Sequence, residues 1–314
     1  MSTILITGGT GFVGGRIARR LGLTNNVIVS SRKVPEPALL EAHGVAGYVL
    51  HHSLLLKDSF PRGIDVVIHL AALNEWDCVT YPSEAIKVNI DETRIILENA
   101  IAAGARRFIY FSTAHVYGSP LKGVITEETL PIPVHPYAIT HKAAEDYVVA
   151  AGLQKKISST VFRLSNSFGA PVVPAVNRWT LLTNDLARQV AEKGNISLLS
   201  NGCQYRDFIC LTDVENIIAA LLERDAGLPE HSIYNLGSGQ AMRVLDMAKA
   251  IAGIQQRLTG KNIEVSLPPG AVPSEEPFLY FDVGRLKSEG FTLDNPIEQE
   301  LEQLLLFCQL NFTA

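Results

Sequence analysis

The chain has 314 residues, with 27 Lys and Arg against 32 Asp and Glu, which gives a formal net charge of −5 and a pI near 5.9. This acidic balance, without a dense run of Lys and Arg, disfavours a nucleic-acid partner. No apolar run reaches the roughly 18 residues that a membrane span needs. A first strand beginning at residue 4 leaves no room for a signal peptide, so we expect a soluble cytoplasmic protein.

The first predicted junction between a strand and a helix carries three glycines. An apolar strand at residues 4–6 is followed by Gly8, Gly11 and Gly14 and then by a helical stretch at 16–21. The first glycine suits unusual backbone angles, the second lets the main chain approach a pyrophosphate, and the third lets the helix pack on the sheet. Free N–H groups at the helix start favour the phosphates. The predicted dinucleotide contacts here are Gly8, Thr10, Gly11, Phe12, Val13 and Gly14.

Apolar runs typical of strands buried on both faces recur at residues 4–6, 27–29, 66–69, 108–111 and 160–163. Helical patterns lie between most of them, chiefly at 83–103 and 137–151, with Gly104 and Gly152 as the expected C-terminal stops. This alternation predicts an α/β fold, a Rossmann-type doubly wound parallel sheet whose ligand lies beyond the carboxyl ends of the strands.

The alternation breaks after Arg163, where a Gly- and Pro-containing stretch begins. We expect a helix at 181–192, a strand at 196–199, a helix at 213–223, a loop around Pro268 and Pro273, and a closing amphipathic helix at 297–308. The predicted division assigns residues 1–165 and 207–236 to an NAD(P)-binding domain. Residues 166–206 and 237–314 form a smaller C-terminal substrate-binding lobe.

The end of the second strand predicts which dinucleotide binds. An acid about 20 residues beyond the glycines would bind the 2′-hydroxyl of NAD, but this chain has Ser30, Ser31, Arg32 and Lys33. A hydroxyl and cations suit a 2′-phosphate through charge-assisted hydrogen bonds. We therefore favour NADP over NAD, with Ser31 and Arg32 as contacts; a solvated basic turn is the alternative.

The four cysteines are scattered without a CxxC pair, at Cys78, Cys203, Cys210 and Cys308. This spacing favours reduced, partly buried thiols over disulfides or a zinc site. His51 and His52 have no apparent third ligand, so no metal site is predicted.

Further motifs lie at residues 7–14, 69–72, 89, 111–118, 136–142, 163–166, 206–208 and 234–239. Together they resemble the extended short-chain dehydrogenase/reductase family of nucleotide-sugar epimerases, dehydratases and reductases. The resemblance implies a homodimer formed by the helices at 83–103 and 137–151. It also implies dinucleotide contacts from Leu70, Ala71, Ala72, Asn89 and Leu164.

The same resemblance implies that Thr113 hydrogen-bonds the substrate oxygen and that Tyr137 exchanges its proton, while hydride passes to or from nicotinamide. A carbonyl and an alcohol interconvert only when a proton donor and a hydride carrier flank the same carbon. A phenol with an ordinary pKa near 10 acts as a base at neutral pH only if nearby positive charge stabilises the phenolate.

The family supplies that charge with a lysine four residues after the tyrosine, where this chain has His141. Residue 141 lies roughly 40° around the helix from Tyr137, whereas Lys142 lies roughly 140° away and is a poor substitute. A largely neutral imidazole disfavours sugar oxidation by phenolate more than ketone reduction by protonated Tyr137. We expect His141 to be a catalytic residue that holds the nicotinamide ribose; a structural helix position is the alternative.

A second departure from the family concerns water elimination. The 4,6-dehydratases follow the threonine with Asp-Glu, and here those positions are Ala114 and His115. Elimination is therefore not expected. His115 is either an acid or base near the substrate or an ordinary loop histidine.

The resemblance further implies substrate contacts from Arg206, which would hold a nucleotide diphosphate, and from Asn166 and Asn74. The family's late Arg-Pro-Gly-Asp stretch is replaced by residues 267–270, which weakens the phosphate site; Asn177, Arg178 and Lys193 either compensate or are solvated.

These observations predict an NAD(P)-dependent oxidoreductase acting on a nucleotide-activated sugar, a small-molecule substrate. A 4-keto-sugar reductase is favoured, because an NADP-type site fits a cofactor that is consumed, and a C4 epimerase is second. The alternatives are a non-catalytic dinucleotide sensor or scaffold and a reductase of a non-sugar ketone.

Overall fold

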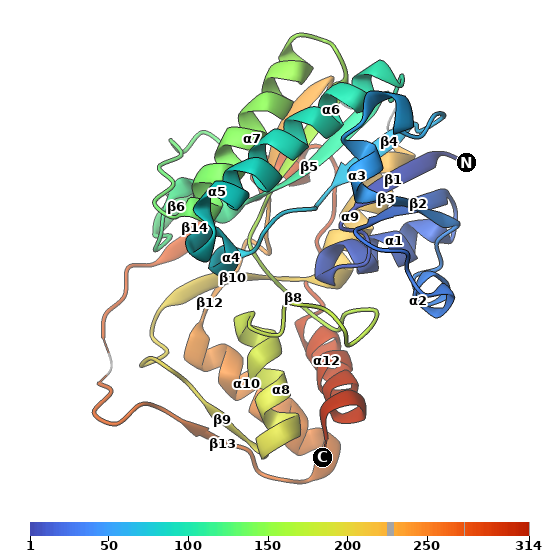
Figure 1. Ribbon diagram of the computed structural model, residues 1–314. Coiled ribbons are helices and arrows are strands. Elements are labelled where there is room, and N and C mark those ends of the chain that lie inside the picture. The colour runs from blue at the N-terminus through green and yellow to red at the C-terminus, as the bar shows by residue number, and fades with distance from the viewer. Residues whose placement is uncertain (225–228, 273, 314) are drawn as a thin grey trace.

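The computed structural model describes residues 1–224, 229–272 and 274–313, and its central layer is a seven-stranded parallel sheet (Figure 1). The strands in spatial order are β11 (His231–Leu236), β7 (Ser158–Leu164), β5 (Arg107–Thr113), β4 (Val66–His69), β1 (Thr3–Thr7), β2 (Asn26–Ser31) and β3 (Gly47–Leu50). The strand order reverses at β1, so the crevice beyond β1 and β4 is the topological switch point at which such sheets bind ligands. The predicted Rossmann-type fold is confirmed.

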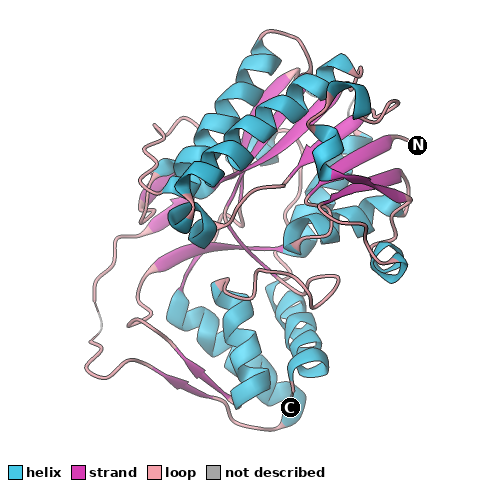
Figure 2. Cartoon of the chain, viewed as in Figure 1, coloured by secondary structure: helices cyan, strands magenta, loops and turns pink. Residues whose placement is uncertain are grey.

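Helices cover both faces of the sheet (Figure 2). On one face, α1 (Phe12–Gly22), α9 (Leu211–Glu223) and α11 (Gly284–Ser288) share an apolar core with β1, β2 and β4. On the other, α3 (His51–Leu54), α6 (Thr93–Ala102) and α7 (Pro136–Leu153) pack against β4, β5 and β7. Strands covered on both sides consist of continuous apolar runs, which is why they could be read from the sequence.

A second body contains a separate apolar core beneath the carboxyl edge of the sheet (Figure 1). Its helices are α8 (Leu182–Lys193), α10 (Val244–Thr259) and α12 (Ile297–Phe312). Its small sheets pair β8 (Asn166–Phe168), β10 (Tyr205–Cys210) and β12 (Ala241–Arg243), and β9 (Asn195–Ser197) with β13 (Glu264–Ser266).

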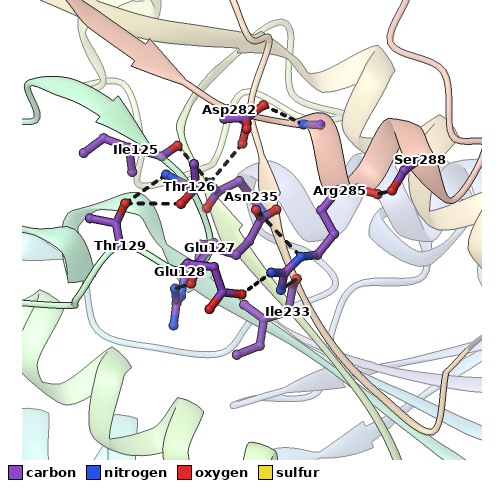
Figure 3. A network of polar contacts seen from close by, with 12 residues as sticks. Ile125, Thr126, Glu127, Glu128, Thr129, Ile233, Asn235, Asp282, Arg285 and Ser288 are labelled. Atoms are coloured by element: carbon purple, nitrogen blue, oxygen red, sulfur yellow. Dashed lines mark hydrogen bonds and ion pairs between the residues drawn. The ribbon is translucent and has the colours of Figure 1, made fainter.

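A polar network fastens the loop after β6 (Gly123–Ile125) to the last strand of the main sheet (Figure 3). The Asn235 side chain donates to the carbonyls of Ile125 and Asp282, at 3.3 and 3.0 Å, while its backbone N–H donates to Glu127 at 2.8 Å. The Asn235 amide oxygen accepts from the Tyr117 hydroxyl at 2.7 Å. This fixes η3 (Ala114–Tyr117), the 3₁₀ turn that directly follows β5, and hence the end of β5.

The remaining short elements are α2 (Pro37–Ala42), η1 (Lys57–Ser59), α4 (Glu75–Thr80), α5 (Pro82–Ala85), the π-helix η2 (Ile86–Glu92) and β14 (Leu279–Phe281). Each predicted strand and helix has a counterpart, but the helix expected at 83–103 is divided into α5, η2 and α6. The strands β3 and β11 of the main sheet and the helix α10 were not predicted. Part of the predicted loop, Pro273, lies outside the described residues.

The prediction that Gly152 ends its helix is wrong. Gly152 lies buried inside α7, where a Cβ would be 2.0 Å from the Ser159 hydroxyl oxygen, so this glycine permits close packing of α7 on β7. The helix ends one residue later, and the positive φ of 55° belongs to Lys155.

Candidate active site

The glycines after β1 let three backbone segments meet. Gly8 has φ +69°, and a Cβ there would lie 3.1 Å from backbone atoms of Leu70 and Ala71. A Cβ on Gly14 would lie 2.3 Å from the Gly8 carbonyl oxygen. Only glycine therefore allows this approach of α1 to the turn and of the turn to the segment after β4.

The first turn of α1 adds the expected anion site. Gly11 is the N-cap, the turn before it contains Thr10, and the helix starts with Phe12 and Val13 without an acidic residue in the first turn. The N–H groups at such a terminus have no partner within the helix. The Phe12 side chain is buried in the core of the second body, so only its backbone faces this turn. The cradle fits a dinucleotide pyrophosphate.

A buried histidine fixes the crossing between β1 and β4. The Thr7 hydroxyl lies 2.8 Å from His69 Nδ1 and accepts the backbone N–H groups of Leu70 and Ala71 at 3.2 Å each. His69 Nε2 is 2.9 Å from the Thr93 hydroxyl, and burial lowers the pKa of His69 to about 3. The segment of Leu70, Ala71 and Ala72 is thus held at the switch point, where the predicted cofactor contacts need to be.

The end of β2 carries the predicted determinants of cofactor preference. Ser31 donates its hydroxyl to the Lys33 carbonyl at 2.5 Å, and the side chains of Arg32 and Lys33 are exposed. The neighbouring Ser30 is buried and accepts the Gly8 N–H at 3.4 Å. Ser31 and Arg32 lie beside the cradle because β2 adjoins β1.

The predicted catalytic residues come from β5 and α7, which pack against each other. Thr113 is the last residue of β5 and Tyr137 is the second residue of α7, which runs antiparallel to the strands, so both lie at the carboxyl edge of the sheet. Thr113 is also in register with Leu164, the end of β7. The Thr113 hydroxyl accepts the His115 N–H at 3.2 Å.

His141 lies one turn along α7 with its ring 4.4 Å from that of Tyr137, centroid to centroid. Its Nδ1 is 3.0 Å from the Tyr110 hydroxyl, while its buried Nε2 has no hydrogen-bond partner. Burial lowers the pKa of His141 to about 4, so the ring is neutral at ordinary pH. A buried ring nitrogen without a partner beside Tyr137 fits a ligand hydroxyl such as a ribose.

Two charged side chains act on Tyr137. Burial first, and then the Glu75 carboxylate, raise the pKa of the Tyr137 phenol to about 12, while Arg178 opposes this rise. Arg178 is the cation that lowers the Tyr137 pKa, and Tyr137 in turn raises the pKa of Arg178. Arg178 Nη1 also lies 2.7 Å from Glu75 Oε2. This pair joins residues 103 positions apart, so no local sequence signal could have revealed it.

Asn89 holds the site together through its side chain. Its amide oxygen accepts the Leu73 N–H at 2.7 Å, and its amide nitrogen donates to Thr140 at 3.0 Å and to Cys78 at 3.4 Å. These contacts connect the π-helix, the loop after β4 and α7. Asn74 caps α4 by accepting the Asp77 N–H at 3.0 Å, which orients the adjoining Glu75.

Two of the predicted substrate residues, Arg206 and Asn166, lie on strands of the second body, whereas Asn74 and His115 lie on the side of the main sheet. Arg206, on β10, contributes to the wall of a cavity of about 300 Å³, and burial lowers its pKa. Other lining residues are Thr180, Asp185, Ser197, Ser200 and Gln204. Burial lowers the pKa of His115, an effect that Glu75 opposes and Arg206 reinforces. The Asn166 amide donates to the Asp207 carbonyl at 3.0 Å, on β10 next to Arg206.

The four cysteines are free and buried, as expected. Among the described residues, no helix is long and apolar enough to cross a membrane.

Comparisons with known proteins agree with this geometry. The family model described as the NAD dependent epimerase/dehydratase family matches residues 4–237. The UDP-glucose 4-epimerase of Haemophilus influenzae is 29% identical over 276 residues, which cover 79% of this chain and 81% of that protein. The UDP-arabinose 4-epimerase 1 of Arabidopsis thaliana is 26% identical over 318 residues, with coverages of 91% and 74%.

Solved structures are similar over almost the entire chain. MoeE5 in complex with UDP-glucose and NAD has a TM-score of 0.78 at 25% identity, covering 99% of this chain and 100% of that one. RMD from Pseudomonas aeruginosa complexed with NADPH has a TM-score of 0.76 at 24% identity, with 99% of each chain covered. The sequence match, the glycine cradle and the parallel sheet lead to one conclusion. The chain is an enzyme of the extended short-chain dehydrogenase/reductase type and belongs to the NAD-dependent epimerase/dehydratase family.

Proposed function

We propose that the enzyme inverts C4 of a nucleotide-activated sugar, with NAD(P) as its cofactor. The observation that carries this proposal is a cation that acts on the phenol: Arg178, paired with Glu75 at 2.7 Å, lowers the Tyr137 pKa against burial and Glu75. The sequence favoured reduction over epimerisation because an NADP-type site fits a consumed cofactor, and because the missing lysine at position 141 disfavours oxidation by phenolate. A guanidinium from elsewhere in the chain supplies positive charge that favours the phenolate, while burial and Glu75 hold the Tyr137 pKa at about 12. Several relatives are named as 4-epimerases.

The chain's residues divide the work as follows. Gly8 to Gly14 and residues 70–72 hold the dinucleotide, and His141 Nε2 bonds its ribose. When bound, the dinucleotide would supply the hydride acceptor and donor for the sugar carbon. Tyr137 as phenolate takes the proton of the C4 hydroxyl, while Thr113 holds the same oxygen. Once the 4-keto sugar presents its other face, Tyr137 would return the proton to that oxygen, which Thr113 still holds.

We propose that the nucleotide part of the substrate binds in the cavity beside Arg206. Its lining hydroxyl, amide and carboxylate groups offer partners for a base and a ribose, and Arg206 offers a guanidinium for the diphosphate. MoeE5 was solved with UDP-glucose, which makes UDP-sugars the first substrates to test. We propose that residues 1–165 with 207–236 bind the cofactor, and that 166–206 with 237–314 bind the substrate.

A 4-keto-sugar reductase is the second candidate, because exposed Arg32 next to Ser31 suits a 2′-phosphate and RMD was solved with NADPH. NADP preference, homodimerisation and a cytoplasmic location stay predictions. Exposed Ile86 and Ile139, on η2 and α7, support packing of these helices against a second copy. Light scattering after gel filtration tests the dimer, and the larger shift in melting temperature with NADPH than with NADH tests the cofactor.

The main experiment incubates the purified enzyme with UDP-glucose, UDP-glucuronic acid and dTDP-sugars, and follows C4 inversion by NMR and nicotinamide by absorbance. An epimerase inverts the sugar without net change in nicotinamide, whereas a reductase consumes NADPH with a 4-keto sugar. Turnover of a non-sugar ketone alone would refute the sugar assignment.

Tyr137→Phe should lower turnover by about 10²-fold or more while the cofactor still shifts the melting temperature. Tyr147→Phe, an exposed tyrosine on the same helix, is the matched control and should keep full activity. Undiminished activity of the Tyr137 variant would remove this phenol from the mechanism.

A further inference from the structure

Neither His141, which stands at the position of the family's lysine, nor its neighbour Lys142 supplies positive charge to Tyr137. His141 is buried and neutral, since its pKa is about 4. The Lys142 ammonium is paired with Asp146 and lies 3.7 Å from Glu145, both on its own helix. A phenolate at position 137 therefore needs a cation from another part of the chain.

Arg178 comes from the segment between β8 and α8, which is anchored in the second body. Its neighbour Trp179 donates its ring N–H to the Pro174 carbonyl at 2.9 Å and packs against Phe307 and Phe312, with centroid distances of 6.0 and 4.7 Å. Trp179 is buried, and Arg178 reaches α4 of the main domain, where it pairs with Glu75 at 2.7 Å. Because α4 packs on α7, this places the guanidinium on the side of Tyr137, whose pKa it influences.

Glu75 sets the position of the guanidinium. The ion pair of 2.7 Å forms at the first residue of α4, whose N-cap is the well-bonded Asn74. Burial raises the pKa of the Glu75 carboxyl, but Arg178 outweighs this and lowers it overall, so the carboxylate is ionised. For Arg178, burial lowers the pKa, but Tyr137 and Glu75 together raise this pKa above its ordinary value.

Other titratable groups around the phenol are uncharged near neutral pH. Burial raises the pKa of the Cys78 thiol, on α4, and of the Tyr110 phenol, on β5. His141, on α7, is neutral. Among the described groups that influence Tyr137, Glu75 and Arg178 are therefore the charged ones, and they act in opposite directions.

We propose that Arg178 is the positioning residue that stabilises the Tyr137 phenolate in place of the family's lysine, and that Glu75 holds Arg178 and moderates its effect. This role rests on the proposed function. On this proposal, the active site is complete only when the segment that carries Arg178 packs against α4 and α7. The cation then comes from the substrate-binding lobe and not from the catalytic helix.

The first test needs neither cofactor nor substrate. The Tyr137 ring is titrated by NMR of protein labelled with [¹³C]tyrosine, and its signal is assigned by its absence in Tyr137→Phe. Glu75→Gln keeps an oxygen that can hold Arg178 but removes the negative charge. It should therefore lower the Tyr137 pKa from about 12 by roughly one unit, a tenfold gain of phenolate at a given pH.

In the Glu75→Gln background, adding Arg178→Ala should reverse this gain of phenolate. Adding Arg178→Lys in the same background should retain part of the gain. Arg257→Ala is the matched control, because Arg257 is exposed and pairs only with exposed Glu298 among the described side chains, at 3.3 Å. If Glu75→Gln with and without Arg178→Ala titrate alike, the proposal is overturned. This result holds whether or not the enzyme acts on nucleotide sugars.

The second test uses turnover once a substrate is known. Arg178→Ala should lower kcat about tenfold or more at pH 8, with KM for the sugar unchanged, and shift the alkaline limb of the kcat profile to higher pH. Arg178→Lys should restore part of kcat. A rise in KM alone would make Arg178 a substrate contact and contradict the proposal, whereas absence of turnover in the wild type would refute only the proposed function.

Discussion

Gly14→Ala is the sharpest test of the cofactor cradle. The added Cβ would lie 2.3 Å from the Gly8 carbonyl oxygen, 2.9 Å from its carbonyl carbon and 3.1 Å from the Gly9 Cα, all backbone atoms that no side-chain rotation can move. To relieve the contact, α1 has to withdraw by about 1 Å, a gap that forfeits a quarter to a half of each affected packing contact. Overpacking of this kind costs about 1–3 kcal/mol.

The same withdrawal removes the N–H groups of the first turn of α1 from the phosphates. We expect dinucleotide affinity to fall about tenfold or more, which corresponds to about 1.4 kcal/mol. Isothermal titration calorimetry with NADPH and NAD measures the affinity, and urea unfolding measures the stability.

Gly253→Ala is the matched control, because Gly253 lies in the interior of α10 with no atom within 4 Å of an added Cβ. There the same substitution should stabilise by about 0.4–1 kcal/mol and leave binding unchanged. Equal stability and equal affinity for Gly14→Ala and the wild type would refute the close-packing argument.

Three further predictions concern stability. Gly152→Ala should destabilise by about 1–3 kcal/mol in urea unfolding, since its Cβ would meet the Ser159 hydroxyl oxygen at 2.0 Å; Tm equal to wild type would contradict the close packing of α7 on β7. Glu145→Gln leaves the buried Arg163 guanidinium, now 2.6 Å from the carboxylate, without its charge partner, and should cost about 3–5 kcal/mol; a loss below 1 kcal/mol would show that the pair is dispensable. His69 has a folded pKa of about 3 against an ordinary 6.5, so the unfolded chain binds one more proton between these values. Its contribution is complete above pH 6.5 and is lost as the pH falls, by up to about 1.4 kcal/mol per unit, so unfolding free energies that are equal at pH 6.5 and 5 would contradict its neutral burial.

The sequence by itself determined most strands of the sheet, the cradle and the first catalytic candidates. Strands β1, β4, β5 and β7 are buried on both faces, so their apolar runs could be recognised without knowledge of their partners. The spacing of Gly8, Gly11 and Gly14 is a local requirement of one tight turn, and Tyr137 and His141 are related by helix periodicity. In these cases the residues that define the feature are near each other in the chain.

Features built from distant residues were decided only by the tertiary structure. The strand β3 is short and only partly buried, so it lacks a strong apolar signal, and Gly152 resembled a helix stop until Ser159 of the adjacent strand was placed against it. The sequence identified Arg178 only as a candidate for a phosphate site, because its spacing from Tyr137 carries no periodicity. Its ion pair with Glu75, and with it its influence on the phenol, depends on where the buried Trp179 anchors the lobe against the main sheet. Electrostatic interactions act through space, and the order of residues along the chain does not determine which charged side chains become neighbours.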